Sequence, residues 1–593
     1  MHASLRLDNF SRLPEPSKAL AISAGNGSLE DLKSLHRLIP DSPVAHLRLF
    51  IPAFYANLSP DELQDVNWPD RLSRAILALK GLSALQGHLV SKASVEVWSA
   101  VWVWINFFAE YQQQHPDVTS TFRIPMYTEF LTTMLSLSRD AETSAKVDAT
   151  HRMRVFFTRG WLAAIEGGAM PQPLVDDLCR VLMELSFADP TTFAEMTEGA
   201  GGTLDHLASL IIQHVYYFVP HKDHTMSDRD GFGVFCIARM FRGDVSMTDG
   251  PLSDALVAHG IVKCTITVLH ALCVGPEIII TEQLIPMQFV ALVTRMRNIP
   301  HSPRIKEAVD NGLLPVVVLT ASLHVPDLLI PLHHLLQEIL PSSLSYHSVL
   351  SSLPTALEEA NDLVDTPGFR TAPHFNAWNQ FVSLATERVA VMRLYNSGAL
   401  ATRRACDNLE CPEVRNDEEL RRCSACQSAF YCSHPCQIAD WTAGHRKLCP
   451  SQKDFGHLST PDRAFLRALL HHDYEAARAE ILAAQLRFLR AHPPGTLFFV
   501  TFNYAAGRLR FEVGPLTGSS AEFGNRVARG GGRVELHLVV VTEGAASKRG
   551  VVLAMRSGSV IVHERLAAVA AGGEPVTPAM VQELLALEVV RTH

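Results

Sequence analysis

Residues 406–449 read CDNLECPEVRNDEELRRCSACQSAFYCSHPCQIADWTAGHRKLC and hold seven of the eleven cysteines of this 593-residue chain. With one histidine they form four pairs: Cys406-x4-Cys411, Cys423-x2-Cys426, Cys432-x3-Cys436 and His445-x3-Cys449. Structural zinc takes four thiolate or imidazole ligands in a tetrahedron, so eight ligands suit two ions. Because the segment is too short and polar to bury a core of its own, we expect metal binding to supply its folding energy.

The spacings within the pairs predict local geometry. The second pair, with two intervening residues, is a knuckle whose thiolates point into one turn. Cys432 and Cys436 are four residues apart, as are His445 and Cys449. Residues i and i+4 share one face of a helix, so the spacing predicts that each of these pairs holds one ion from a short helix. It leaves open whether the zinc sites are sequential or interleaved.

The second half of the segment, FYCSHPCQIADWTAGHRKLC at 430–449, closely resembles the MYND zinc finger. The resemblance implies interleaved ligation, in which one zinc is held by Cys406, Cys411, Cys432 and Cys436 and the other by Cys423, Cys426, His445 and Cys449. One departure is the first pair, where two intervening residues are usual in the family. The regions on either side more loosely resemble those of uncharacterised fungal MYND-domain proteins, and that comparison implies no activity.

Two zinc ions with four protein ligands each leave no position for water or substrate, so we expect a structural metal centre without catalytic residues. MYND fingers bind proline-rich peptides in a shallow groove, and such peptides are already extended before they bind. By resemblance, Ser424, Gln437 and Trp441 match the groove positions. Trp441 would stack on a proline and Gln437 would hydrogen-bond the peptide backbone. The alternative is that Trp441 packs the finger against a neighbouring domain.

The composition predicts a folded chain without a general attraction for nucleic acid. Apolar residues make up 47%, charged residues 19%, and the net charge is −9. From Arg403 to Cys449, seven basic side chains stand against seven acidic ones, so no phosphate-binding face is expected. The N-terminus has no signal-peptide pattern, and polar residues interrupt the most apolar stretches, Ile278–Val293 and Leu313–Leu336. We therefore expect an intracellular protein, cytoplasmic or nuclear, that binds no membrane.

Residues 1–400 are predicted to form a helical domain. Proline and glycine divide its apolar segments, and Ser28 opens one of them as the first residue of a capping box. At Gly167-Gly168, Gly199, Gly260 and Gly312, a polar residue and glycine precede an apolar helix. This pattern is typical of turns between armadillo or HEAT repeats, in which glycine ends one helix in the left-handed region. The spacings are irregular, so a non-repetitive helical domain is the alternative.

Residues 451–593, after the predicted finger domain at 401–450, are expected to form a small α+β domain. One apolar helical stripe runs from Leu466 to Leu489 and ends at Pro493-Pro494-Gly495. Strand-like runs and then two helical patterns follow: 497–504, 509–513, 534–541, 550–555, 560–569 and 578–587. Gly530-Gly531-Gly532 follows a helix and precedes a strand, the reverse of a phosphate-binding loop, and is expected to be a turn.

The predicted fold is mainly α, with a helical N-terminal domain, a central two-zinc finger and a C-terminal α+β domain. We expect a protein-interaction module or adaptor that docks a proline-rich segment of a partner protein. The alternative is an enzyme whose active site lies outside the finger. Some MYND proteins carry a SET methyltransferase domain around the finger, but the Asn-His-Ser-Cys signature of that domain is absent from this sequence. A polar pocket with converging acid, base or nucleophile in residues 455–593 would favour the enzyme.

Overall fold

The computed structural model describes residues 1–59, 68–219, 226–241, 250–275, 281–298, 301–400, 403–426, 428–453, 458–516, 521–544, 547–572, 575–587 and 589–593. The chain forms two compact units. The first comprises Met1–Cys264 with Gly275–Leu284, and the second comprises Thr265–Val274 with Ile285–His593. The boundaries expected near residues 400 and 450 lie inside the second unit and stay a prediction.

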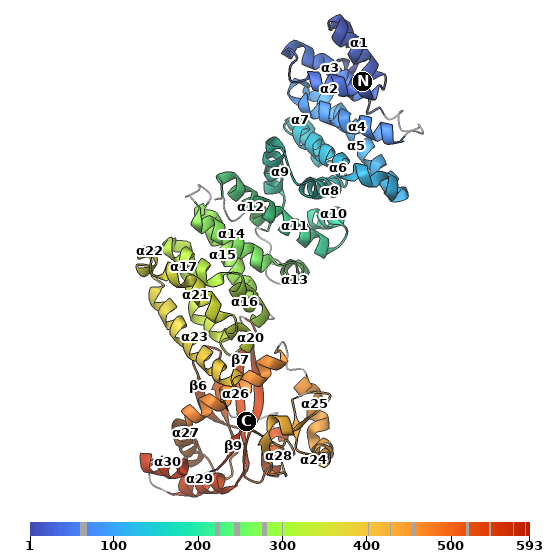
Figure 1. Ribbon diagram of the computed structural model, residues 1–593. Coiled ribbons are helices and arrows are strands. Elements are labelled where there is room, and N and C mark those ends of the chain that lie inside the picture. The colour runs from blue at the N-terminus through green and yellow to red at the C-terminus, as the bar shows by residue number, and fades with distance from the viewer. Residues whose placement is uncertain are drawn as a thin grey trace. The chain divides into compact units, whose positions relative to one another are not determined.

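The first unit is built from helices, which Figure 1 shows in blue and green. They are α1 (Glu15–Gly25), α2 (Leu29–Leu38), α3 (Val44–Ala56), α4 (Trp68–Ala84), α5 (Ser91–Gln114), α6 (Pro116–Leu137), α7 (Ala141–Asp148), α8 (Met153–Glu166), α9 (Gln172–Glu184), α10 (Pro190–Ala200), α11 (Leu204–Phe218), α12 (Asp228–Met240) and α13 (Pro251–Ala258). Alternate helices pack in sequence, α2 on α4, α4 on α6, α6 on α8 and α8 on α10. Such stacking gives a continuous core, in which Trp98, Phe130 and Trp161 are buried.

The predicted helix signals in this unit are confirmed in part. The Ser28 side chain accepts a hydrogen bond from the backbone of Asp31 and caps α2. Gly260 has a φ of 85°, as a left-handed helix end requires. Gly199 differs from the prediction because it lies inside α10, where a Cβ would meet the carbonyl oxygen of Val155 at 2.4 Å. Glycine is needed there for the close approach of α10 to α8.

The second unit begins with a helical part. Its helices are α16 (His301–Asp310), α17 (Leu313–Ser322), α18 (Leu329–His334), α19 (Leu340–Ser343), α20 (His347–Leu350), α21 (Leu353–Val364), α22 (Pro367–Arg370) and α23 (Phe375–Asn396), preceded by α14 (Ile261–Val274) and α15 (Thr281–Arg297). The apolar α17 is buried. Within the described parts of the chain, no single helix is long and apolar enough to cross a membrane, and the bent pair α13–α14 meets that test by length and composition only.

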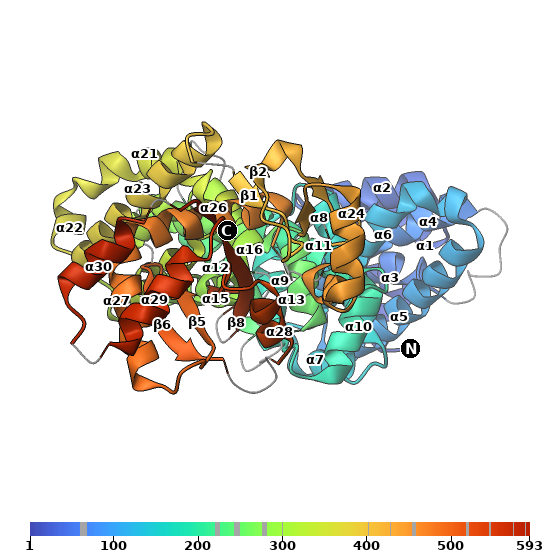
Figure 2. The same ribbon diagram turned by 90° about the horizontal axis from the view of Figure 1, so that it is seen from below.

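The cysteine-rich segment and a five-stranded sheet complete the second unit. The segment contains β1 (Arg403–Ala405), β2 (Val414–Asn416), β3 (Arg421–Arg422), β4 (Phe430–Tyr431), α24 (His434–Asp440) and α25 (Arg446–Lys453). The elements that follow are α26 (Thr460–Ala476), α27 (Arg478–Ala491), β5 (Phe498–Asn503), β6 (Arg510–Pro515), α28 (Ala521–Arg529), β7 (Val534–Thr542), β8 (Lys548–Ser557), α29 (Ile561–Ala571), α30 (Pro578–Leu585) and β9 (Arg591–Thr592). Helices α29 and α30 pack on α27 (Figure 2).

The sheet has the strand order β6-β5-β7-β8-β9, in which only β5 and β7 pair in parallel. The predicted strands and the last two helices are all present, and Gly530-Gly531-Gly532 forms the turn between α28 and β7. The single stripe predicted from Leu466 to Leu489 is two helices that meet at Ala477. A buried ion pair between Arg388 of α23 and Asp473 of α26, at 2.8 Å, ties the helical part to this domain.

Candidate metal centre

Two short hairpins position the metal-ligating side chains. In the first, β1 and β2 enclose the loop from Cys406 to Cys411, and the backbone N–H of Cys406 donates to the carbonyl of Glu413 at 2.9 Å. In the second, β3 and β4 enclose the loop that carries Cys426, closed by a bond from Cys423 N–H to Ala429 at 2.9 Å. Each hairpin therefore fixes the backbone on both sides of a cysteine pair.

The hairpins also bind each other, which brings cysteines from distant parts of the segment together. Asp407 donates its backbone N–H to the carbonyl of Phe430 at 2.7 Å, and its carboxylate accepts from the Phe430 N–H at 2.7 Å. Cys432 follows directly after β4, beside the loop that holds the first pair. The next residue, Ser433, caps α24 by accepting from the backbone N–H of Cys436 at 3.4 Å.

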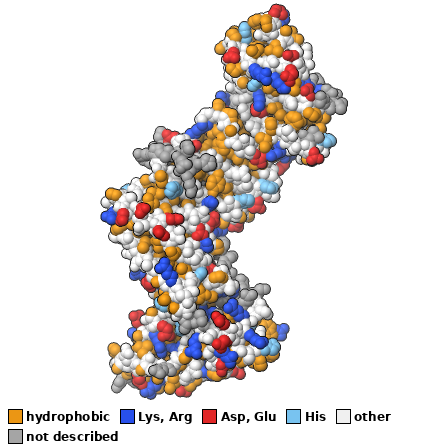
Figure 3. Space-filling view, viewed as in Figure 1, with side chains coloured by type: hydrophobic (Ala, Val, Ile, Leu, Met, Phe, Trp, Pro, Cys, Tyr) orange, Lys and Arg blue, Asp and Glu red, His pale blue; other side chains and the backbone are white. Residues whose placement is uncertain are grey.

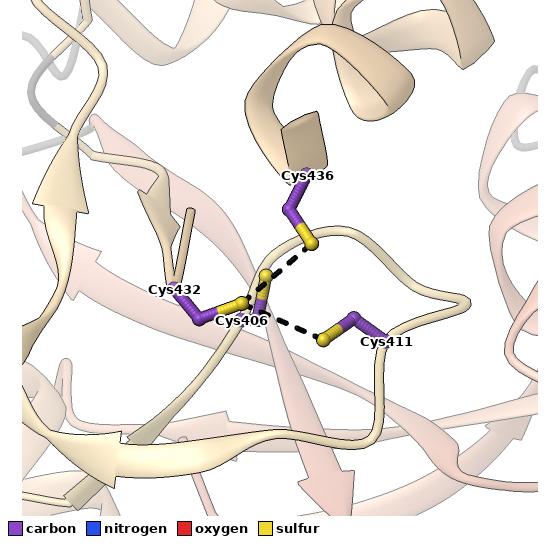
Figure 4. A group of neighbouring side chains, drawn as sticks. All are labelled: Cys406, Cys411, Cys432 and Cys436. Carbon is purple, nitrogen blue, oxygen red and sulfur yellow. Dashed lines mark hydrogen bonds between the residues drawn. The ribbon is translucent and has the colours of Figure 1, made fainter. Parts of the chain in front are cut away.

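The first group comprises Cys406, Cys411, Cys432 and Cys436, whose sulfur atoms all lie within 4.8 Å of one another. Figure 4 shows the four thiols pointing toward a common centre. The Sγ atoms of Cys432 and Cys411 are 3.7 Å apart, and those of Cys432 and Cys436 are 3.6 Å apart. A zinc tetrahedron with Zn–S bonds of about 2.3 Å has S–S edges of about 3.8 Å, so the group has the size that zinc requires.

The second group comprises Cys423, Cys426, His445 and Cys449, all buried, with ligand atoms again within 4.8 Å of one another. The sulfur of Cys426 lies 3.6 Å from Nε2 of His445, and the sulfurs of Cys423 and Cys449 are 3.9 Å apart. These distances match the edges of a tetrahedron of three thiolates and one imidazole, for which bond lengths predict about 3.6 and 3.8 Å. The two groups therefore fit two zinc ions in the interleaved arrangement.

The helical geometry expected from the four-residue spacings holds for His445 and Cys449 but is wrong for Cys432 and Cys436. Cys432 lies ahead of the α24 cap and only Cys436 is in the helix. His445 ends a short π-helical turn, Trp441–His445, and Cys449 lies in α25. Gly444, with a φ of 150°, kinks the chain just before His445. The ligands converge because strand ends and helix starts meet at each site.

Burial and local hydrogen bonds set different pKa values for the thiols. Burial raises the pKa of Cys411 to about 11 and that of Cys449 to about 12. Burial also opposes ionisation of Cys423, yet bonds from the Cys426 backbone and from His445 lower its pKa to about 6. Zinc binds thiolates, so its entry displaces protons from the high-pKa thiols and its affinity rises with pH.

The family model of the MYND finger matches residues 406–449. These residues are a MYND finger. No curated protein and no solved structure gives a significant match, so the looser resemblance to fungal proteins receives no support from these comparisons.

The MYND finger is docked on the sheet by residues that the sequence does not reveal. Arg556 of β8, only 5% exposed, donates to the carbonyls of Cys406 and Cys411 at 2.9 Å each and to that of Leu409 at 3.4 Å. Leu409 itself is 1% exposed and packs on Val534 and Leu536 of β7. The first knuckle, which is two residues longer than is usual in the family, thus provides an apolar anchor in Leu409. The only sign of this anchor in the sequence was an apolar residue in a long, polar loop.

A second connection runs through α28. Arg529 donates to the carbonyl of Ala443 at 3.2 Å and pairs with Glu410 at 3.5 Å, so it contacts both ends of the MYND finger. Arg533, just after α28, donates to the carbonyl of Glu410 at 3.2 Å. The finger therefore has a fixed orientation on the C-terminal sheet.

The expected peptide-binding residues lie on the surface of the MYND finger. Trp441 is 39% exposed, and its ring lies 5.8 Å from that of His445. Ile438, one turn earlier, is 52% exposed, Gln437 is half-buried and Ser424 is exposed. Among the described residues, no hydrogen bond or ring contact joins Ser424 to Gln437 or Trp441, so a groove that includes all three stays a prediction.

Among the described residues, a third group brings Cys179, His214 and Cys236 together in the first unit. Its hydrogen bonds disfavour metal. Trp161, which can only donate, bonds Nδ1 of His214 at 3.0 Å, so Nε2 carries the proton and donates to the carbonyl of Gly233 at 3.0 Å. Burial lowers the pKa of His214 to about 4, so the ring stays neutral. The histidine has no lone pair left for an ion, and the group is a buried structural contact.

Proposed function

We propose that the protein is an adaptor whose MYND finger docks a proline-rich segment of a partner protein. MYND fingers are protein-interaction modules, and both metal groups of this finger use all four tetrahedral positions for protein ligands. A centre of that kind holds a surface in shape and leaves no position for a substrate. Zinc is the cofactor, and its role is structural.

The exposed ring of Trp441 carries the proposal. The Trp441 side chain is 39% exposed, and Ile438, one helical turn earlier and 52% exposed, extends its apolar surface. The contact with His445 holds the ring against the second zinc group, so little side-chain entropy is lost when a proline stacks on it. Gln437 lies beside Ile438 and would supply hydrogen bonds to the peptide backbone.

We further propose that the chain comprises a helical domain at 1–400, the finger at 401–450 and an α+β domain at 451–593. The successive packing of α2, α4, α6, α8 and α10 supports a solenoid of armadillo or HEAT type in the first part. We infer an intracellular site of action, cytoplasmic or nuclear, because zinc-binding thiols persist in reducing compartments. Side chains of both charges are intermixed on the face in Figure 3, and we propose a protein partner rather than nucleic acid.

The test is Trp441→Ala in the zinc-loaded full-length chain, measured against an array of proline-rich peptides and then by titration of the best binder. Removal of an aromatic hot spot should weaken the affinity at least about tenfold. Native mass spectrometry should still find two zinc ions, because the ring is not a ligand.

The matched control is Ile561→Ala, which truncates an apolar side chain that is 46% exposed on α29, outside the finger. It should leave peptide affinity within about twofold. Equal affinity of wild type and Trp441→Ala, with zinc retained in both, would refute the groove.

A further inference from the structure

Strand β8 leaves most of one side of the C-terminal sheet open. In the strand order β8 lies between β7 and β9, and among the described residues β9 pairs only with Arg556 and Ser557. Within that part of the chain, residues 548–555 of β8 therefore have a strand partner on the β7 side alone. An open edge presents backbone N–H and C=O groups that a further strand can bind.

The backbone hydrogen bonds at the end of β8 show which groups face the open edge. The N–H of Gly558 donates to the carbonyl of Val590 on the β9 side, at 2.9 Å. The N–H of Ser557 donates to the carbonyl of Arg533 on the β7 side, also at 2.9 Å. Successive residues of a strand alternate between its two sides, so the even-numbered residues of β8 face away from β7. Between Lys548 and the part that pairs with β9, these residues are Gly550, Val552 and Ala554.

The two edges of this sheet differ in composition. On β6, the opposite edge, Arg510, Glu512 and Pro515 provide charge and proline, two features that prevent unwanted pairing between strands. Residues 550–555 of β8 read GVVLAM and contain neither. The three outward-facing residues among them are exposed or half-buried. Native sheets seldom leave such an apolar edge unprotected, so its sequence indicates that a strand binds there.

A basic pocket lies against one face of the open edge. It is lined by Val551 and Leu553 of β8 and by arginines from β1, β3 and α26, which are Arg404, Arg422, Arg463 and Arg467. Three of these guanidinium groups lie 4.1–5.9 Å from the centre of the Phe430 ring, so positive charges from different elements converge. Among the described residues that line the pocket, none is acidic. The charge of this face therefore favours an acidic segment.

The other face of the open edge is apolar. Val552 and Ala554 pack against the cluster that Leu409 of the finger forms with β7. Side chains of a strand alternate between the two faces of a sheet. A strand added to β8 would therefore direct every second side chain to the apolar face and the others to the arginines.

We propose that the open edge of β8 binds an extended segment of a partner protein in which acidic and apolar residues alternate. The segment lies antiparallel to β8, in line with β9, and exchanges backbone hydrogen bonds with Gly550, Val552 and Ala554. Its acidic side chains face the arginines and its apolar side chains cover the opposite face. The surface includes neither Trp441 nor Gln437, so the proposal is independent of the peptide groove of the finger.

The probe is a capped heptapeptide that alternates valine with glutamate, titrated by fluorescence anisotropy into the zinc-loaded full-length chain. One comparator has lysine in place of glutamate. The other has N-methyl groups at the valines, whose N–H groups would face β8, and keeps every side chain. The glutamate peptide should bind at least about tenfold more tightly than either comparator.

Each comparator tests one part of the proposal. Equal affinity for the glutamate and lysine peptides would overturn the acidic character of the partner. Equal affinity for the N-methylated peptide would overturn the addition of a strand. No saturable binding of the glutamate peptide up to about 1 mM would overturn the surface as a whole.

Two proline variants locate the binding. Val552→Pro removes one outward N–H and leaves the bonds to β7, and proline is tolerated where a strand N–H faces away from its sheet. Val513→Pro is the matched control on β6, where the N–H of Leu516 bonds Leu497 and odd-numbered residues therefore face outward. Val552→Pro should weaken the glutamate peptide at least about tenfold and Val513→Pro less than about twofold. Unchanged affinity in Val552→Pro refutes the proposal.

A second pair of variants tests the charge. Arg422→Gln removes a guanidinium from the basic pocket, whereas Arg421→Gln removes the adjacent exposed one, which is not among the residues that line it. Arg422→Gln should weaken the glutamate peptide about threefold to fivefold, and Arg421→Gln less than about twofold. Equal effects of the two variants would contradict the role of the pocket.

Hydrogen exchange in the wild-type chain keeps the test independent of any variant. At saturation with the glutamate peptide, the amides of Gly550, Val552 and Ala554 should exchange at least about tenfold more slowly. Those of Val551 and Leu553 face β7 and should change less than about twofold. Unchanged exchange at the three outward amides would overturn the proposal even if Val552→Pro failed to fold.

Discussion

Replacing Arg556 by Met should release the first zinc ion while the second stays bound. The guanidinium of Arg556 is the main polar link between the sheet and the first knuckle, and it holds the carbonyls of Cys406, Leu409 and Cys411. Methionine fills similar space with no donor. The carbonyls would then be buried without partners, or the knuckle would move away from the sheet.

The expected loss follows from the two hydrogen bonds of 2.9 Å. A hydrogen bond from a charged group contributes about 1.5–3 kcal/mol, so two contribute about 3–6 kcal/mol. Part of this is offset because the guanidinium is buried, and burial lowers the pKa of Arg556. We therefore expect the variant to destabilise the docked state of the knuckle by about 3 kcal/mol. This corresponds to a change of about 100-fold in the equilibrium constant between the docked and undocked states.

The assay is release of metal to a chromogenic chelator from the two-zinc protein. Cobalt substitution then identifies the site, because four-thiolate and three-thiolate, one-imidazole centres have different absorption spectra. The four-cysteine group in Arg556→Met should lose metal about 100-fold faster than in wild type, in proportion to the larger open population. Arg556→Lys, which keeps the charge with a single donor group, should fall between the two proteins.

Arg565→Met is the control, since it removes an exposed guanidinium from α29 that pairs with Glu583. It should leave both release rates within about twofold of wild type. If Arg556→Met also released the four-cysteine metal within twofold of wild type, the reasoning that the sheet supports this knuckle would be refuted.

The remaining predictions concern the second zinc, the apolar anchor and one buried carboxylate. Cys426→Ala or His445→Ala should each lose one zinc by native mass spectrometry and unfold the finger locally, and retention of two ions would contradict the ligand assignment. Leu409→Ala removes a buried side chain and should cost about 2–5 kcal/mol of finger docking, seen as faster limited proteolysis at 403–453 with cleavage elsewhere unchanged. Burial alone would raise the pKa of Glu535, but Arg591 and hydrogen bonds lower it from 4.5 to about 2, a difference worth about 3 kcal/mol. Because the pKa is lowered in the folded state, the ionised carboxylate stabilises the fold above pH 4.5, and this stabilisation is lost as the pH falls toward 2. Hydrogen exchange in β7 should therefore be faster in Glu535→Gln than in wild type by that energy at pH 7, and the two proteins should converge in acid. A difference that does not depend on pH would count against this role of Glu535.

Much of this protein follows from local pattern. The eight ligands and the number of zinc ions were predictable, because the ligand residues and the spacings of their pairs all lie within 44 consecutive residues. The strands from residue 498 to 557 and the helices that follow were predictable, because the spacing of apolar residues that distinguishes strand from helix is set by residues close together in the sequence. The break at Ala477 was not, since the apolar stripe continues across it and only packing distinguishes one helix from two.

Sequence alone determined that the chain is mainly helical, that residues 406–449 bind two zinc ions, and that a small α+β domain follows. Tertiary structure decided the parallel pairing of β5 with β7, the convergence of Cys432 with the first knuckle from a strand end, and the docking of that knuckle by Arg556 and Leu409. Contacts of this second kind join residues up to about 150 positions apart, and their free energy depends on three-dimensional proximity. No period, spacing or composition in a single sequence carries that information.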